Sequence, residues 1–371
     1  MSKRHITVLV SNDLEFDQRV RKVCATLNAL DFEITLVGRL LTTSRNFERP
    51  YELRRFRLWF SKGALFYAHL NLRLFFYLLF KKTDIILAND LDTLLPAFLV
   101  ARLRGKELVY DSHEYFTEAE GLTGRKFQKA VWERIEGWIF PKLKSVYTVN
   151  ESIANIYRSK YRVNVRVVRN IPEIKGFDAI QNRADIRLPS DKFIMILQGA
   201  YIDPDRGALE ALQSLEFLDN VLLLIIGSGR EMPRLKEMAT QPIYRDKVMI
   251  LDKMPFAELM QYTMNADLGL TLDKPIHLNY KYSLPNKLFD YIHAGVPVLA
   301  SDLPELNRII TKFKVGFLIE KTTPEQIASK VKEVMNSQSL IDAKAACTLA
   351  KNELNWQHEE KILKEIFSQI L

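Results

Sequence analysis

Short apolar runs alternate with longer amphipathic stretches along most of the chain. Residues 6–10 form an apolar run that is followed by a loop and by a helical pattern over residues 17–30, after which residues 33–37 form another apolar run. Short apolar runs predict buried strands, whereas apolar residues spaced three and four apart predict helices. Strands that alternate with helices in this way predict parallel strands joined by right-handed crossovers, which is a doubly wound α/β sheet.

The alternation forms two successive series, and each series predicts one domain. In the first, strands are predicted at residues 6–10, 33–37, 85–88, 108–110, 145–149 and 165–172, with helices at 17–30, 94–103 and from 151. In the second, strands are predicted at 193–198, 221–226, 248–251, 268–272 and 298–300, with helices at 208–217, 230–239, 256–266, around 290 and at 324–335. A chain of 371 residues is too long for one ordinary core, which agrees with two domains.

We predict an N-terminal domain over residues 1–175 and a C-terminal domain over residues 190–350. Residues 173–192 are polar and lack clear periodicity, so the linker is expected there. Residues 351–371 are expected to form a C-terminal helix that packs back on the first domain. Because ligands of doubly wound sheets lie beyond the carboxyl ends of the strands, both domains are expected to direct their binding loops into a cleft between them.

Composition narrows the class of protein only in part. The chain is 47% hydrophobic and 26% charged, which excludes wholesale disorder. Its two cysteines, Cys24 and Cys347, lie far apart without metal-type spacing, so a reducing compartment is expected. The N-terminus runs directly into a predicted strand, so no signal peptide is expected. The net charge of +8 indicates an anionic partner, and nucleic acid is the weakest candidate because zinc-finger spacing, an RNP-like strand and a long basic run are all missing.

Residues 64–80 form the most hydrophobic stretch of the chain. The stretch is shorter than the roughly 20 residues that a spanning helix needs, and Arg73 lies in its middle. His69, Arg73, Tyr77 and Lys81 recur every fourth residue, so a helix here has one narrow polar stripe. With the basic and aromatic residues just upstream, segment 54–82 has the composition of an interfacial contact with an anionic membrane. A helix buried against the sheet is the alternative.

The most informative segment for chemistry runs from Ser283 to Asp302. A loop that bears Ser283 and Pro285 is expected to open a helix, and Gly295-Val-Pro297 is expected to end it before the next strand. Free N–H groups at the helix start form a site for anions, and Lys287 adds a positive charge there. Asp290 is better suited to accept hydrogen bonds from hydroxyl groups. A ligand with phosphates and vicinal hydroxyls, such as a nucleotide, satisfies both; a capped amphipathic helix without a ligand is the alternative.

Several short motifs occur in a fixed order around these predicted elements. They are Asp111-Ser-His-Glu114, Asn170-Ile-Pro172, Gln198-Gly199 through Arg206-Gly207, Ile226-Gly-Ser-Gly229 and the segment 286–297. In this order, together with two doubly wound sheets, they resemble the GT-B glycosyltransferases, and among them the retaining group called glycosyltransferase family 4. The resemblance covers nearly the whole length.

The resemblance implies roles for three residues at the reacting centre. His113 falls where the family has an active-site histidine that faces the donor sugar. Arg206 falls on the basic residue that binds the donor diphosphate, and a guanidinium can hold two phosphate oxygens at once. Lys287 is interpreted as a replacement for an arginine that many members carry at the position of Ala200.

The resemblance also implies a substrate-binding set. Asp290 falls on the second glutamate of the family signature, which is expected to accept hydrogen bonds from the ribose. The first glutamate of that signature is replaced by Tyr282, and Ser11-Asn-Asp13 occupies the place of a glycine pair. The expected binding residues are Asn12, Asp13, Gly199, Gly229, Met254, Ser283, Leu284, Pro285, Asn286 and Asp290.

The expected reaction is transfer of a sugar from a nucleotide-diphosphate sugar to an acceptor hydroxyl, with retention by resemblance. Arg206, Lys287 and the helix start at Asn286 would stabilise the departing diphosphate. We find no Asp-x-Asp motif that indicates a metal, so no metal and no cofactor are expected. A glycan or lipid-linked acceptor at the inner face of the cell membrane is expected, with the protein in the cytoplasm.

Two other functions stay open from the sequence. A sugar-nucleotide epimerase shares the two-domain architecture and would need no acceptor. A non-catalytic binding protein at a membrane surface is the other. Tyr282 and Ala200, which replace the glutamate and the arginine of the family pattern, are consistent with it, because fold alone does not determine function.

Overall fold

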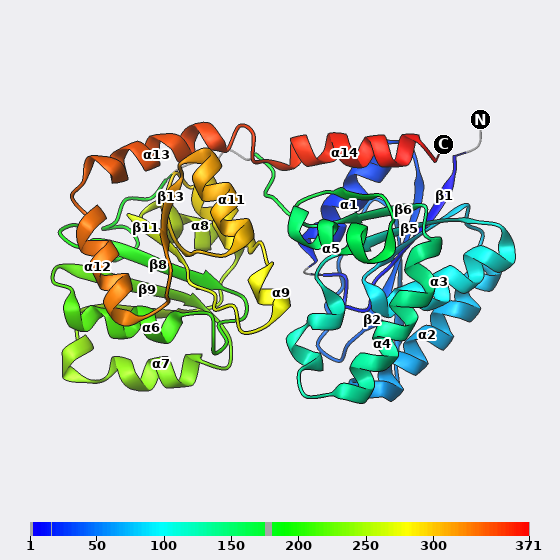
Figure 1. Ribbon diagram of the computed structural model, residues 1–371, viewed down its shortest axis with the longest axis horizontal. Helices are drawn as coiled ribbons and strands as arrows, with labels where there is room; N and C mark the ends of the chain where they lie inside the picture. The colour runs from blue at the N-terminus through cyan, green and yellow to red at the C-terminus, as the bar shows by residue number, and fades with distance from the viewer. Residues whose placement is uncertain (1–2, 16, 175–179, 371) are drawn as a thin grey trace. The chain divides into compact units, whose positions relative to one another are not determined.

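The computed structural model describes residues 3–15, 17–174 and 180–370, and they form two α/β units (Figure 1). One unit comprises the chain up to Asn170 together with the residues from His358 on, and the other comprises Ile171–Gln357. The units thus differ from the predicted bounds 1–175 and 190–350. The predicted C-terminal helix, 351–371, divides between them.

The first unit contains a seven-stranded sheet in the order β3-β2-β1-β4-β5-β6-β7, and its strand pairs are parallel. Its strands are β1 (His5–Leu9), β2 (Glu33–Leu40), β3 (Glu52–Arg57), β4 (Ile85–Asn89), β5 (Glu107–Ser112), β6 (Ser145–Thr148) and β7 (Val165–Val167). Its helices are α1 (Gln18–Ala29), α2 (Gly63–Phe80), α3 (Leu91–Arg104), α4 (Lys126–Ile139), α5 (Glu151–Tyr161) and α14 (Trp356–Ser368), most of which belongs to this unit.

The second unit contains a six-stranded parallel sheet in the order β10-β9-β8-β11-β12-β13. Its strands are β8 (Phe193–Gly199), β9 (Val221–Gly227), β10 (Val248–Asp252), β11 (Leu268–Thr271), β12 (Val298–Ser301) and β13 (Gly316–Ile319). Its helices are α6 (Ala208–Gln213), α7 (Met232–Ala239), α8 (Phe256–Met264), α9 (Leu278–Lys281), α10 (Asn286–His293), α11 (Pro304–Phe313), α12 (Pro324–Val334) and α13 (Gln338–Ala350).

The predicted fold class is confirmed. Central strands are continuous apolar runs because helices cover both faces of the sheet, and all seven residues of β9 are buried. The structure adds elements that the pattern did not predict, namely β3, α4, α9, α11, β13 and α13. β3 is an edge strand rich in charge, Glu-Leu-Arg-Arg-Phe-Arg, and exposed edges of this kind lack the apolar run that marks a central strand.

The predicted linker, 173–192, differs from the structure. Residues 175–179 lie outside the described residues. Further on, Ile186 and Leu188 are buried in the core of the second unit, and Arg183 donates a hydrogen bond to Asp267 at 2.7 Å. This part of the segment therefore belongs to the second unit.

Both sheets reverse their strand order at one point. In the first unit the chain leaves β1 toward β2 on one side and returns to β4 on the other; in the second, β8 and β11 have the same relation. Loops that leave such a pair of strands diverge and open a crevice at the carboxyl edge, where ligands of this sheet type bind. The residues that follow β1, β4, β8 and β11 are therefore the first place to look for a site in each unit.

Candidate active site

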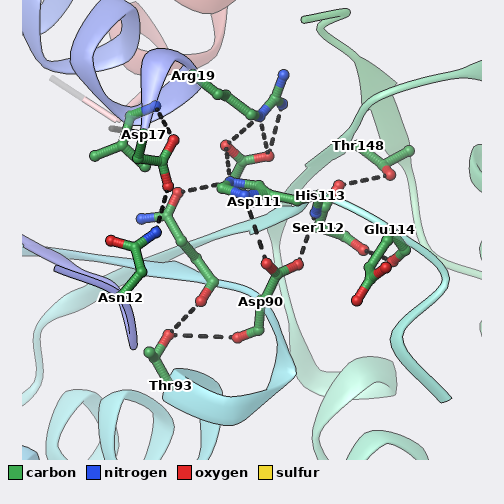
Figure 2. Close-up of polar contacts among 12 residues, drawn as sticks. Asn12, Asp17, Arg19, Asp90, Thr93, Asp111, Ser112, His113, Glu114 and Thr148 are labelled. Carbon is green, nitrogen blue, oxygen red and sulfur yellow. Dashed lines mark hydrogen bonds and ion pairs between the residues drawn. The ribbon is translucent and has the colours of Figure 1, made fainter. Parts of the chain in front are cut away.

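At the carboxyl edge of the first sheet, polar side chains surround His113 (Figure 2). His113 follows directly after β5 and its side chain is 20% exposed. Its ring Nδ1 lies 3.4 Å from Asp90 Oδ2. Its Nε2 lies 3.0 Å from Asn89 Oδ1 and 3.2 Å from Asp111 Oδ2. Three acceptor oxygens therefore face the two ring nitrogens.

Asp90 is held in an unusual backbone conformation between β4 and α3. Its φ of 58° and ψ of 166° fall in a region that is nearly reserved for glycine and is found mainly at functional sites. In this conformation Asp90 Oδ1 accepts a hydrogen bond from the backbone N–H of His113 at 2.8 Å. Burial raises the pKa of Asp90 to about 7, although His113 acts to lower it.

Asp111 connects His113 to Arg19 at the start of α1. Arg19 is 3% exposed, and its Nη2 and Nε donate to the two oxygens of the fully buried Asp111 at 2.7 Å and 2.9 Å. Burial opposes ionisation of Asp111, but Arg19 and His113 together lower its pKa below the usual value. Burial also disfavours the charged form of His113 and so acts to lower its pKa, but Asp90 and Asp111 raise that pKa to about 9.

The predicted binding residues of the first loop, Asn12 and Asp13, have partners within their own unit. Asn12 Nδ2 donates to Asp17 Oδ2 at 2.6 Å, and Asp17 in turn caps α1 by accepting from the Val20 N–H. Asp13 Oδ1 accepts from Ser44 Oγ at 2.7 Å. The loop is thus shaped by these contacts, and the substrate roles of Asn12 and Asp13 stay predictions.

In the second unit, Arg206 is anchored by a residue that the sequence analysis did not single out. Arg206 Nη1 donates to Asp273 Oδ1 at 2.9 Å, and its guanidinium carbon lies 4.1 Å from the centre of the Tyr280 ring. Asp273 follows β11 and is fully buried, and its other oxygen, Oδ2, has no hydrogen-bond partner in the described part of the chain. Burial disfavours the positive charge of Arg206, but Asp273 outweighs burial and raises the pKa of Arg206. The guanidinium therefore stays a cation.

Lys287 lies in the first turn of α10, whose N-cap is Pro285. Within the described residues its ammonium group has no hydrogen bond and no ion pair. Desolvation and the charge of Arg206 lower the pKa of Lys287, and Asp273 partly opposes them. The structure therefore brings Lys287 and Arg206 within interaction range, beside a helix start whose free N–H groups favour anions.

Asp290 lies one turn further along α10. Its Oδ2 accepts a hydrogen bond from Gln198 Nε2 at 3.2 Å, at the end of β8. Gln198 is oriented by the buried Thr263, whose hydroxyl donates to Gln198 Oε1 at 2.7 Å. The carboxylate of Asp290 is therefore positioned by a chain of contacts from the core.

The two glycines at the end of β9 are required by the packing of the chain itself. Gly227 and Gly229 have φ values of 154° and 151°. A Cβ on Gly227 would lie 1.9 Å from the carbonyl oxygen of Gly199, and one on Gly229 would lie 2.3 Å from that of Ile202. These glycines allow the two strand-end loops to pack together, which explains them without a ligand.

The remaining predicted binding residues lie around the start of α10 or after β10. Met254 and Leu284 pack against the core of the unit, and Ser283 Oγ donates to the Tyr280 carbonyl at 2.9 Å. Asn286 is exposed at the helix start. Tyr282, at the position of the missing glutamate, caps the short helix α9. None of these contacts decides a substrate role.

Two Asp-x-Asp sequences were passed over by the sequence analysis, Asp90-Leu-Asp92 and Asp203-Pro-Asp205. In the first, Asp90 faces His113 and Asp92 is buried at the start of α3, with its pKa raised to about 6 by burial. In the second, Asp203 pairs with Arg230 at 3.1 Å. Among the described residues no group of three or more His, Cys, Asp or Glu side chains is placed to hold a metal ion.

The residues with site contacts that were not proposed as functional from the sequence include Asn89, Asp90, Asp111, Arg19, Gln198 and Asp273. A polar residue within two positions of the end of a buried strand was the available signal for Asp90 and Asp273. Each lies at a strand that borders the reversal of strand order, β4 in one unit and β11 in the other.

Two Rossmann-like sheets with polar residues at both reversal points define the GT-B architecture, and solved structures confirm this class of fold. Sucrose-phosphate synthase from Thermosynechococcus elongatus matches with a TM-score of 0.76 and 14% identity, over 99% of this chain and 99% of that chain. Anabaena Alr3699/HepE in complex with UDP and glucose matches with a TM-score of 0.73 and 13% identity, over 99% of this chain and 100% of that chain.

Sequence comparisons establish the family. The model of the glycosyltransferase family 4 domain matches residues 18–172, and that of glycosyl transferases group 1 matches residues 179–352. The chain belongs to these glycosyltransferases. One curated relative is the chitobiosyldiphosphodolichol beta-mannosyltransferase of Candida albicans, 25% identical over 176 residues; the match spans 45% of this chain and 38% of that protein.

Proposed function

We propose that this glycosyltransferase moves a sugar from a nucleoside-diphosphate sugar to an acceptor hydroxyl in the assembly of a cell-surface or lipid-linked glycan. The observation that carries the proposal is the cation pair of Arg206 and Lys287 beside the start of α10, with Asp290 one turn further on. Cations at a helix start suit a diphosphate, and a carboxylate one turn away suits the ribose hydroxyls. The complexes of HepE with UDP and with UDP-glucose support a donor of this class.

In this mechanism the second unit supplies the charge that the leaving group needs. As the bond between the anomeric carbon and the phosphate oxygen breaks, its electron pair goes to the diphosphate. Arg206, Lys287 and the N–H groups of α10 stabilise the growing negative charge because they are oriented before the reaction. Two fixed cations take the place that a divalent metal would have, so the reaction is proposed to proceed without metal.

The proposed stereochemical outcome is retention, which follows from the family resemblance. The acceptor oxygen forms a bond to the anomeric carbon on the side that the diphosphate leaves, and the acceptor proton moves to the leaving phosphate oxygen. The proton NMR coupling of the anomeric hydrogen in the first-formed product tests this directly. A product of opposite anomeric configuration to the donor contradicts retention and leaves sugar transfer intact.

A donor screen tests the function itself. UDP-, GDP-, ADP- and CMP-sugars are added separately, and the shift in the melting temperature is measured, because a ligand of the folded state raises apparent stability. The donor that stabilises the protein is then incubated with and without chelator and with candidate acceptors. Stabilisation by none of the nucleotide sugars contradicts the proposal, and an isomerised nucleotide sugar formed without acceptor supports an epimerase instead.

We also propose that the acceptor is reached at an anionic membrane surface facing the cytoplasm, where the protein binds peripherally. By length and composition alone, helix α2 is long and apolar enough to cross a membrane, and 22% of it is buried. One stripe of it, Phe66, Leu70, Leu74 and Leu78, is buried in the unit. In its polar stripe, Lys81 pairs with Glu52, and Arg73 lies over the Phe56 ring at 4.9 Å while remaining exposed.

Most of the large exposed side chains of α2 are apolar. Leu65, Leu72, Phe76 and Phe80 are between 52% and 81% exposed. Further exposed apolar residues lie on α4, which contacts α2 through the rings of Tyr67 and Trp132; they are Phe127, Val131 and Trp138. Exposed basic residues accompany this surface, and they include Lys62, Arg73, Lys82, Arg102 and Lys126. Apolar side chains among cations fit anionic lipid headgroups.

Vesicle sedimentation tests the membrane proposal. The protein is expected to sediment with phosphatidylcholine vesicles that contain phosphatidylglycerol, and less so at high salt because salt screens the attraction. The variant Leu72→Gln/Phe76→Gln/Phe80→Gln is expected to stay in the supernatant. The matched control is Ile341→Gln/Leu349→Gln, which removes apolar residues that are 62% and 71% exposed on α13. Equal sedimentation of both variants contradicts the proposal.

A further inference from the structure

The direction of one amide group determines the protonation of His113. Asn89 is 2% exposed, and its Nδ2 donates to the Leu9 carbonyl at 2.9 Å. A carbonyl only accepts, so the amide nitrogen must point to Leu9 and the amide oxygen must point to His113 Nε2. Because that oxygen also only accepts, Nε2 must carry a hydrogen. Asp111 Oδ2, 3.2 Å away, is a second acceptor for the same N–H.

The other ring nitrogen faces an acceptor as well. Asp90 Oδ2 lies 3.4 Å from Nδ1, while its Oδ1 is occupied by the backbone N–H of the same histidine. Both oxygens of Asp90 thus contact His113, and this arrangement accompanies the positive φ of Asp90. With Asp90 ionised, both ring nitrogens face acceptors, so each carries an N–H group and His113 is an imidazolium. A protonated Asp90 would instead donate to Nδ1 of a neutral ring, and the two forms differ by the position of one proton between Asp90 and His113.

Charge counting agrees with this result. Arg19, Asp111, His113 and Asp90 form a chain of contacts from α1 through β5 to the end of β4. With Asp90 ionised, a cationic His113 makes this chain neutral, whereas a neutral imidazole leaves one uncompensated negative charge in a poorly hydrated place. The imidazole is the stronger base of the pair, because burial raises the pKa of Asp90 only to about 7 while Asp90 and Asp111 raise that of His113 to about 9. The other ionisable groups nearby, Asp92 and Glu114, are acidic, and both interact with Asp90.

We infer that His113 is a fixed cation of the site rather than a proton acceptor, and that Asp90 is the positioning residue that holds it. The statement about charge depends only on the first unit, whereas the statement about proton transfer rests on the proposed function. A histidine with no lone pair on either nitrogen cannot take the acceptor proton. That proton must then pass to another group, and in the proposed reaction it passes to the leaving phosphate oxygen.

Nitrogen-15 NMR of the histidine side chains tests the charge. The His113→Gln variant identifies the signals of His113, and the spectra are followed between about pH 5.5 and 10, across the usual histidine pKa and well beyond it. We expect both nitrogens of His113 to give imidazolium signals at neutral pH, with a midpoint near 9. Signals of a neutral tautomer at neutral pH overturn the inference.

Variants at position 90 test the positioning role. Asp90→Asn is expected to lower the midpoint of His113 by about one pH unit or more, because it removes a carboxylate in contact with the ring. Asp90→Gly removes the same carboxylate and tolerates the positive φ, so it keeps the test open if Asp90→Asn folds poorly. Glu33→Gln is the matched control, since Glu33 lies 3.2 Å from another histidine, His5. An unchanged midpoint in both Asp90 variants overturns the positioning role.

The pH dependence of kcat/KM separates this inference from the proposed function. If His113 were the base, kcat/KM would rise through a midpoint near 6.5, the ordinary histidine value, and His113→Gln would remove that rise. We expect no such step, and its presence overturns the inference. If no nucleotide sugar supports transfer at all, the proposed function fails while the NMR result stands by itself.

Discussion

The charged clusters of the two units are built from the same kinds of groups but are completed differently. In the first, the cations Arg19 and His113 are matched by Asp111 and Asp90. In the second, Asp273 pairs with Arg206, while Lys287 only feels its charge; among the described residues one oxygen of Asp273 has no hydrogen-bond partner. The first cluster matches two cations with two carboxylates when His113 is an imidazolium, whereas the second sets two cations against the one carboxylate that pairs with Arg206, at a helix start. The difference indicates that the anion of the substrate belongs to the second unit.

The comparison predicts its largest effect at the unmatched cations. Arg206→Ala or Lys287→Ala is expected to lower kcat by 10²–10³, about 3–4 kcal/mol, as for the loss of one preorganised donor in a transition state. Steady-state kinetics with the donor found in the screen measures this. Arg308→Ala is the control, because Arg308 pairs with Glu305 on α11 and is 44% exposed. Full turnover by either site variant would remove that residue from the anion site.

A second test concerns the nucleoside end of the same site. Asp290→Ala is expected to weaken binding of the nucleoside diphosphate by about 1.5–3 kcal/mol, the usual value of hydrogen bonds to a charged group. Titration calorimetry measures the affinity, and Asp342→Ala, an exposed carboxylate on α13, is the control. If the affinity is unchanged, Asp290 does not bind the ribose.

Per pH unit, the smallest expected effect belongs to the cluster of the first unit, and it concerns stability. The pKa of His113 is raised from 6.5 to about 9, so its contribution to the free energy of unfolding is complete below 6.5 and is lost as the pH rises through 9. Urea unfolding between about pH 7 and 9.5 should show stability falling by at most about 1.4 kcal/mol per pH unit. His113→Gln should flatten this slope, and an equal slope in that variant would contradict the assignment.

The sequence pattern was sufficient for the sheets and for the segment around α10. Its apolar runs locate most of the strands, and Gly295, with φ 73°, ends the region of α10 before β12 as predicted. Apolar runs are informative here because parallel strands are buried on both faces. Where a strand is at the edge, as β3 is, charge replaces this pattern and the prediction fails.

The partners of the site residues could not be predicted, because they are distant in the chain or depend on backbone geometry. Arg206 and Asp273 are separated by 67 positions, and Arg19 and Asp111 by 92. The positive φ of Asp90 has no mark in the sequence, since aspartate adopts it far less readily than glycine. For α2, periodicity located a polar stripe, but only the structure shows that Lys81 pairs with Glu52 and that Arg73 lies over the Phe56 ring.

The last helix, α14, has a consequence for how the protein is made. Glu359 is fully buried against Arg169, and Phe367 packs on Phe32 with ring centres 5.9 Å apart, so the first unit is completed by residues that follow the whole second unit in the chain. The second unit is one continuous stretch and can fold while synthesis continues. The unit that is synthesised first is therefore completed after the second unit. Until then the apolar surface that Phe367 covers is exposed to chaperones or to aggregation.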